Sequence, residues 1–329
     1  TQGVSSAASD VYKRQVKHHS FNYKTNKSIY NILSGKKSHQ TFFDASSQQL
    51  LSLYHSLPKL KYQTFERLLN KNDIKELNVK VHPRFTYDSL NNTFKCIQLL
   101  IQTISQYLHH QLKFVPMNQQ VIIQNKVKKI YGTIIKNDLI KDFENEVTDL
   151  FQAISLNNNN KCYLHYYLHG YDEPMYTRQQ VSLIENISIS KLYTLELNNL
   201  VTLGSEIENK QRYPILSECI ILSSLLNKTS ITQQYLHQGL SLNEIAIAQN
   251  VKLNTIEDHI LELFIKGYEK NYENYVEKKD VFQFTQYYTE HKGERLKIYK
   301  QEFDHLSYFE IKLMIVGIER GEINVREQS

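Results

Sequence analysis

Apolar residues recur every three or four positions along most of this chain, which is the spacing of one face of an α-helix. The longest stripe runs from Leu90 to Leu108 and must be buried against other elements. Further helices are expected at 44–57, 116–135, 138–154, 162–169, 178–184, 190–203, 213–226, 268–276 and 307–317. Residues 75–85 alternate briefly, but Pro83 interrupts them, so no strand is expected there. The predicted fold class is all-α.

Residues 230–267 have the sequence pattern of a helix-turn-helix. Ser241 and the glutamate three residues later predict a capping box at the start of the second helix. Asn254 is expected to N-cap the third helix. Ala246 is small enough to let the second and third helices cross closely. The side chains expected to face inward are Ile231, Tyr235, Leu236, Leu242, Ile245, Ala246, Ala248, Val251, Ile256, Ile260, Leu263 and Phe264.

In a DNA-binding protein of this class, the exposed start of the third helix would approach the major groove. The candidate contact residues are Lys252, Asn254, Thr255, Glu257, Asp258 and His259. Residues 228–266 contain three basic and four acidic side chains, so this segment alone should hold duplex DNA weakly. The pattern is therefore compatible with contact to DNA and with docking to a protein partner.

The composition of this 329-residue chain is that of a globular protein, with 41% hydrophobic and 22% charged residues. No apolar run is long enough to span a membrane. The cysteines Cys96, Cys162 and Cys219 are far apart and form no zinc-binding pair. We therefore expect a reduced cytoplasmic protein without membrane contact, bound metal or cofactor.

Charge is distributed unevenly along the sequence. Residues 16–137 contain 18 basic and 5 acidic side chains, whereas residues 138–329 contain 19 and 28. A basic surface attracts phosphate backbones, so nucleic acid is expected to meet the first half of the chain. The candidate phosphate contacts are Lys36, Lys37, Lys126, Lys128 and Lys129.

Two short motifs resemble catalytic or metal sites without completing them. The run from Gly35 to Ser38 lacks the upstream glycine of a P-loop, and a lysine occupies the position where the P-loop has serine or threonine. His165 and His169 are spaced to share one helix face, but no glutamate base and no third ligand accompany them. We expect the chain not to be an enzyme.

The run GLSLNEIA (239–246), the run LNTIEDH (253–259) and EFDHLSYFEIKLMIV near the C-terminus resemble the helicase-associated helix-turn-helix family. The matching positions are Gly239, Glu244, Ile245, Ala246, Thr255, Ile256, Glu257, Asp258 and His259. The family pattern usually has arginine at the position of Gln249, which weakens a direct DNA role for this segment. Such domains occur fused to RecQ-type DNA helicases and in stand-alone bacterial proteins often encoded beside a RecQ-type helicase gene. The resemblance implies a DNA-metabolism role linked to such a helicase.

These observations predict four regions: a non-native or disordered leader at 1–15, a basic helical domain at 16–226, the helix-turn-helix at 227–267 and packing helices at 268–329. The expected function is that of a non-enzymatic DNA-binding accessory protein of DNA repair or recombination. A RecQ-type helicase and DNA are the expected partners. A transcription regulator and a pure protein adaptor are the alternatives, and the sequence leaves the oligomeric state open.

Overall fold

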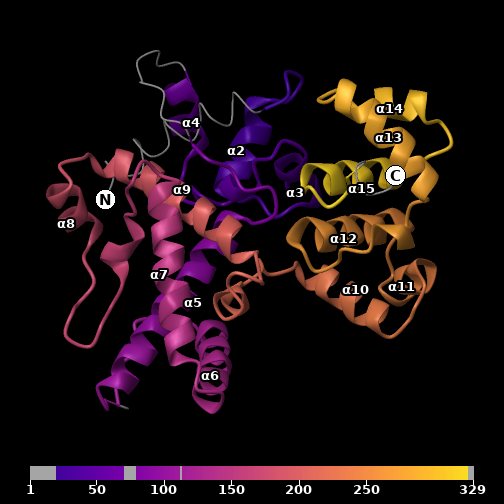
Figure 1. The fold of residues 1–329 in the computed structure, drawn as a ribbon. Helices are drawn as coiled ribbons and strands as arrows, with labels where there is room; N and C mark the ends of the chain where they lie inside the picture. Colours follow the sequence, from indigo (N-terminus) through magenta and orange to yellow (C-terminus); the bar gives the residue numbers. More distant parts are fainter. Residues whose placement is uncertain (1–19, 70–78, 112, 325–329) are drawn as a thin grey trace. The chain divides into compact units, whose positions relative to one another are not determined.

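The computed structural model describes residues 20–69, 79–111 and 113–324, and every regular element in these ranges is a helix (Figure 1). The all-α fold class is therefore confirmed. Within the described ranges, no helix is long and apolar enough to cross a bilayer. The leader predicted at 1–15 lies outside the described residues.

The described residues form two compact units, and the first consists of 68–69, 79–82 and 87–221. Its long helix α5 packs against α6 and α9, and α7 packs on α9. Ile97, Leu100 and Leu150 are fully buried in this unit, so the long apolar stripe of α5 is covered as expected. The elements are α5 (Tyr87–Leu108), α6 (Val121–Lys136), α7 (Ile140–Leu156), η2 (Leu164–Tyr167), α8 (Arg178–Ile184), α9 (Ile189–Ile207) and η3 (Leu216–Cys219), where η denotes a 3₁₀ helix.

The second unit consists of residues 20–67, 83–86 and 222–324, so it joins an N-terminal segment to the helix-turn-helix. Its centre is α12, which packs against α3, α10, α11 and α15. Figure 1 shows the indigo α3 beside the yellow α15. The elements are α2 (Asn26–Ser34), α3 (His39–Ser47), η1 (Leu51–Leu53), α4 (Tyr62–Leu69, its last two residues counted with the first unit), α10 (Asn227–His237), α11 (Leu242–Ala248), α12 (Leu253–Lys266), η4 (Tyr272–Asn274), α13 (Lys278–Glu290), α14 (Leu296–Glu302) and α15 (Tyr308–Glu319).

This division differs from the predicted one, which placed residues 16–226 in a single domain. Residues 20–67 contain 7 basic and 2 acidic side chains, yet they pack with the acidic C-terminal segment. In the described ranges the first unit holds 13 basic and 13 acidic residues, and the second holds 20 and 17. The strong charge asymmetry of the sequence is therefore not an asymmetry between the two units.

Several predicted helices are shorter than expected or are absent. The helix expected at 44–57 ends at Ser47, because Gln49 adopts a left-handed conformation with φ +56°. At 213–226 a single 3₁₀ turn replaces the helix, since the backbone N–H groups of Ile215 and Leu216 donate to the Glu146 carboxylate. The segment 268–276 likewise holds one 3₁₀ turn. In each case the apolar periodicity predicted correctly that the segment packs against other elements. It could not show which groups form hydrogen bonds with the backbone.

Candidate nucleic-acid interface

The helix-turn-helix is formed by α10, α11 and α12, and its local signals behave largely as predicted. Ser241 accepts a hydrogen bond from the Glu244 backbone N–H, and the Glu244 carboxylate accepts one from the Ser241 N–H at 2.7 Å. Gly239 follows α10 with φ +85°, a conformation that favours glycine. The third helix begins at Leu253 with Lys252 as its N-cap, so Asn254 is its second residue and the predicted N-cap was wrong.

Half of the predicted core positions of the motif are buried, whereas Tyr235, Leu236, Leu242 and Val251 are half-buried and Ala248 is exposed. Ile245, Ile256, Ile260 and Phe264 have no exposed surface, and Leu263 is also buried. Ile231 is 41% exposed, however, and Thr229 and Thr232 fill the inner face of α10 instead. That face is polar because it meets the polar side chains of α12 described below.

The third helix is exposed only at its start. Its side chains from His259 to Lys266 are all buried, because α3, α10, α11 and α15 enclose this part of the helix. The exposed or partly exposed positions of this helix and its N-cap lie in residues 252–258, hereafter the α12 tip. A partner can therefore meet this helix end-on but cannot lie along its length.

Three of the predicted contact residues lie in the α12 tip and can donate hydrogen bonds. Lys252 and Asn254 are exposed, and Thr255 is partly exposed. Ammonium, amide and hydroxyl groups at these positions can donate hydrogen bonds to phosphates or base edges.

His259 does not belong there, and its prediction as an outward contact was wrong. Its side chain is 1% exposed, and its Nδ1 lies 2.7 Å from the Thr232 hydroxyl. Gln249 donates to the same hydroxyl at 2.6 Å. While accepting from Gln249, that hydroxyl can also donate its own proton to an unprotonated Nδ1. Burial, followed by the neighbouring His39, lowers the pKa of His259 to about 4.

Gln249, at the position where the family pattern usually has arginine, therefore has a structural role. Its amide reaches from the end of α11 to Thr232 on α10 and ties the first two helices of the motif together. The substitution removes a cation from the segment and adds a partly buried hydrogen bond.

A buried ionic cluster connects the N-terminal helix α3 to the helix-turn-helix. Glu262 has no exposed surface and accepts hydrogen bonds from Thr229, Lys266 and the Leu226 backbone N–H at 2.5, 2.6 and 2.9 Å. His39 Nε2 lies 3.1 Å from the same carboxylate. Burial alone would raise the pKa of Glu262, but these partners lower it to about 2. Sequence reasoning missed this cluster, although the spacing of Glu262 and Lys266 by four residues is a recognisable helical ion-pair signal.

The acidic pair at the α12 tip is partly neutralised. Lys312 of α15 lies 3.8 Å from the Asp258 carboxylate. Burial, and then the charge of Asp258, raise the pKa of Glu257. Lys312 was not foreseen, because it is distant in sequence and approaches through the packing of α15 on α12.

The five predicted phosphate contacts fall in different units. Lys36 and Lys37 lie exposed in the loop between α2 and α3, in the unit of the helix-turn-helix. Lys128 and Lys129 are exposed and Lys126 is partly exposed on α6, in the other unit. No acidic residue interrupts α6, so its outer face is basic. The role of these lysines stays a prediction.

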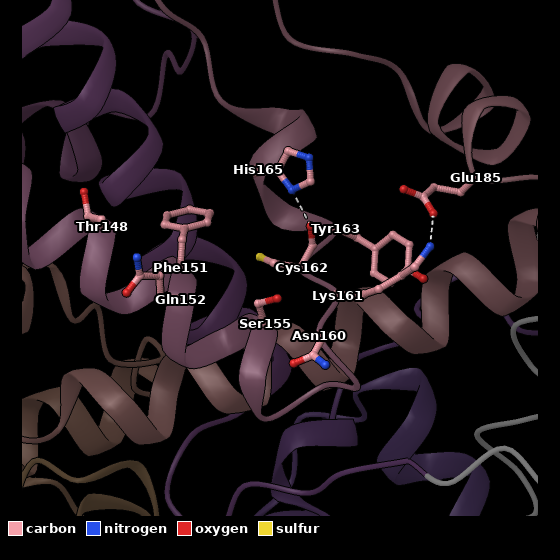
Figure 2. A pocket seen from close by; sticks show the side chains of 10 residues that line it. All are labelled: Thr148, Phe151, Gln152, Ser155, Asn160, Lys161, Cys162, Tyr163, His165 and Glu185. Carbon is pink, nitrogen blue, oxygen red and sulfur yellow. Dashed lines mark hydrogen bonds and ion pairs between the residues drawn. The ribbon is translucent and has the colours of Figure 1, made fainter.

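The first unit also contains a cavity of about 520 Å³ beside α7 (Figure 2). Figure 2 shows His165 Nδ1 directed at the Cys162 carbonyl oxygen and Lys161 paired with Glu185. The Lys161 ammonium lies 2.5 Å from the Glu185 carboxylate. Burial raises the pKa of the Cys162 thiol, so it is a poor nucleophile near neutral pH. His165 lies in a 3₁₀ turn and His169 lies beyond it, so they do not share an α-helical face as the sequence spacing implied. Among the residues described, no group of three His, Cys, Asp or Glu side chains is placed to hold a metal ion.

Comparison with known proteins supports the motif assignment. Residues 228–315 match the family model of a helix-turn-helix domain, which extends from the start of α10 into α15. The chain is similar to Protein YpbB of Bacillus subtilis (strain 168), with 20% identity over 331 residues that span 87% of this chain and 91% of that protein. No solved structure matches the chain.

Proposed function

We propose that this chain is a non-enzymatic DNA-binding accessory protein that acts with a RecQ-type DNA helicase. The observation that carries the DNA part is the accessible α12 tip on a complete helix-turn-helix. Six residues of α-helix rise by about 9 Å, which is within the roughly 12 Å width of a major groove. An end-on approach is the geometry by which the start of a recognition helix reads base edges.

The net charge of residues 228–266 indicated weak DNA binding, but the individual side chains at the α12 tip suit contact with DNA. Lys252 can contact a phosphate, while Asn254 and Thr255 can bond to base edges or to the backbone. Asp258 faces Lys312, so its charge is partly compensated before DNA approaches.

The helicase partnership rests on the resemblance of 239–259 and the C-terminal run to the helicase-associated family. One feature also favours the alternative of a pure protein adaptor. Ile247 on α11 is 81% exposed, and the neighbouring α11 residue Ala248 is exposed as well. An apolar side chain of this exposure is better matched to a protein surface than to phosphates.

A double charge reversal at the α12 tip separates the two uses. We expect Glu257→Lys with Asp258→Lys to raise nonspecific DNA affinity and to abolish any preference among sequences or DNA structures, because new cations dominate the contact. The helicase complex should persist. DNA affinity is measured by titration on single-stranded, duplex and forked DNA, and the complex by pull-down with a RecQ-type helicase.

The adaptor alternative makes the opposite forecast for the same variant. If the tip docks a basic protein surface, the pull-down signal disappears because the two acidic groups that attract that surface are reversed. Loss of the complex with an unaltered DNA preference would therefore replace the DNA-reading proposal by the adaptor.

A further inference from the structure

We propose that Lys36, Lys37 and Lys228 form one phosphate-contact surface, hereafter the lysine edge, that binds the DNA backbone beside the helix-turn-helix. This inference rests on the proposed function and deepens it, because it assigns the sequence-independent part of DNA binding to named residues. Two of these lysines come from the N-terminal segment and one from α10.

Contacts between α3 and α10 bring these distant residues together. His39 Nε2 lies 3.5 Å from the Thr229 hydroxyl and 3.1 Å from Glu262. Lys37 precedes His39 by two residues, and Lys228 directly precedes Thr229. The His39 and His259 rings, 5.3 Å apart, continue the contact into α12. The lysine edge therefore flanks the helix whose tip is proposed to enter the groove.

The loop that carries Lys36 and Lys37 is fixed by its own hydrogen bonds. The Tyr54 hydroxyl donates to the carbonyl oxygens of Gly35 and Lys36 at 3.0 and 3.3 Å. Gly35 has φ +75°, and a Cβ there would overlap the His55 ring. Ser38 then caps α3. A rigid loop loses little conformational entropy when its lysines bind a ligand.

The three ammonium groups are available to an external anion. All three lysines are exposed, and across residues 20–69, 79–111 and 113–324 no ion pair involves them. Other lysines of the same unit are paired, as Lys24 is with Asp44 and Lys292 is with Glu319. Glu262, the acid that His39 and Thr229 contact, is buried and already paired with Lys266.

The test compares three triple variants of the full chain. Lys36→Gln with Lys37→Gln and Lys228→Gln should weaken binding to all DNA sequences at least about tenfold at low salt. It should also reduce the slope of log affinity against log salt by up to about 2.7, or about 0.9 for each phosphate that a lysine no longer neutralises. Affinity is measured by fluorescence anisotropy on duplex DNA between about 50 and 200 mM salt.

The matched control replaces Lys270, Lys279 and Lys297 by Gln. These lysines are exposed in the same unit, so the change in net charge is identical. We expect this control to keep nearly the parental slope of log affinity against log salt. Lys36→Arg with Lys37→Arg and Lys228→Arg should also keep that slope, because arginine retains the positive charge. Equal effects of the two Gln triples, or an unchanged slope in the first, would overturn the lysine edge while leaving the proposed DNA function intact. Absence of DNA binding by the unaltered chain would overturn both.

Discussion

Ala246 illustrates how a single small side chain sets the geometry of the motif. It is 7% exposed on α11, and α11 packs against α12. Two residues further along, Ala248 is exposed. The two alanines thus have the same chemistry and opposite environments on one seven-residue helix.

This pair gives a direct stability test. We expect Ala246→Glu to lower the free energy of unfolding by about 3 kcal/mol or more, because it places an unpaired charge in a packed interface. Ala248→Glu, the control, should change it by less than about 0.5 kcal/mol. Urea denaturation of both variants measures the difference, and equal stabilities would show that the register of α11 is misassigned.

Thr232 shows how a residue that sequence patterns treat as neutral can satisfy a buried polar side chain. Its hydroxyl bonds to Gln249 and to His259, and it is fully buried. Burial of the imidazole, followed by the charge of His39, lowers the pKa of His259 and favours its neutral form.

At the scale of elements, α12 is the axis on which α3, α10, α11 and α15 assemble. The buried side chains of α12 include His259, Glu262 and Lys266 among apolar ones, so the assembly should respond to pH. His259 has a folded pKa of about 4, below the value of about 6.5 for a free imidazole. Glu262 has a folded pKa of about 2, below the value of about 4.3 for a free carboxyl group.

Both groups destabilise the fold in acid, but in different pH windows. Between about pH 6.5 and 4 the unfolded chain binds a proton at His259 that the folded chain excludes, so stability falls as pH falls. Glu262 lowers the stability further between about pH 4.3 and 2, because there the carboxylate of the unfolded chain is protonated before that of the folded chain. Each contribution is on the order of 3 kcal/mol.

Replacing His259 should remove the upper window alone. We expect His259→Gln to lose less free energy of unfolding than the unaltered chain between about pH 6.5 and 4.5, because the contribution of this imidazole is removed. His237→Gln, at an exposed position of α10, is the control and should keep the parental profile. Denaturation at a series of pH values makes the measurement, and a parental profile in His259→Gln would contradict the assignment.

At the scale of the whole molecule, the lysines predicted to bind phosphates are divided between two units. Lys36 and Lys37 belong to the helix-turn-helix unit, and the α6 lysines belong to the other. Their contributions to DNA binding should therefore be separable and close to additive, since the two sets share no partner among the described residues.

Separate charge reversals test this division. We expect Lys126→Glu, Lys128→Glu and Lys129→Glu together to weaken binding to all sequences about equally and to flatten the salt dependence. Lys36→Glu with Lys37→Glu should do the same independently, and the combined variant should show the sum of the two free-energy changes. Unchanged affinity after the α6 reversals would remove α6 from the interface and leave DNA contact to the helix-turn-helix unit.

The sequence by itself determined those features of the helices that depend on residues close together in the chain, namely where a helix begins or ends and which of its faces is apolar. The Ser241 capping box, the left-handed Gly239 and the apolar stripe of α5 could all be predicted this way, because each depends on residues within a few positions. The helix-turn-helix was predictable for the same reason.

Only the tertiary structure decided what surrounds the motif. It brought His39 to Glu262, Lys312 to Asp258 and Glu146 to the 213–226 segment across long stretches of chain. It also buried His259 between Thr232 of α10 and His39 of α3, so that this polar side chain does not face outward. Periodicity shows which face of a helix is apolar, but burial of a polar face depends on partners that are distant in sequence and supply its hydrogen bonds.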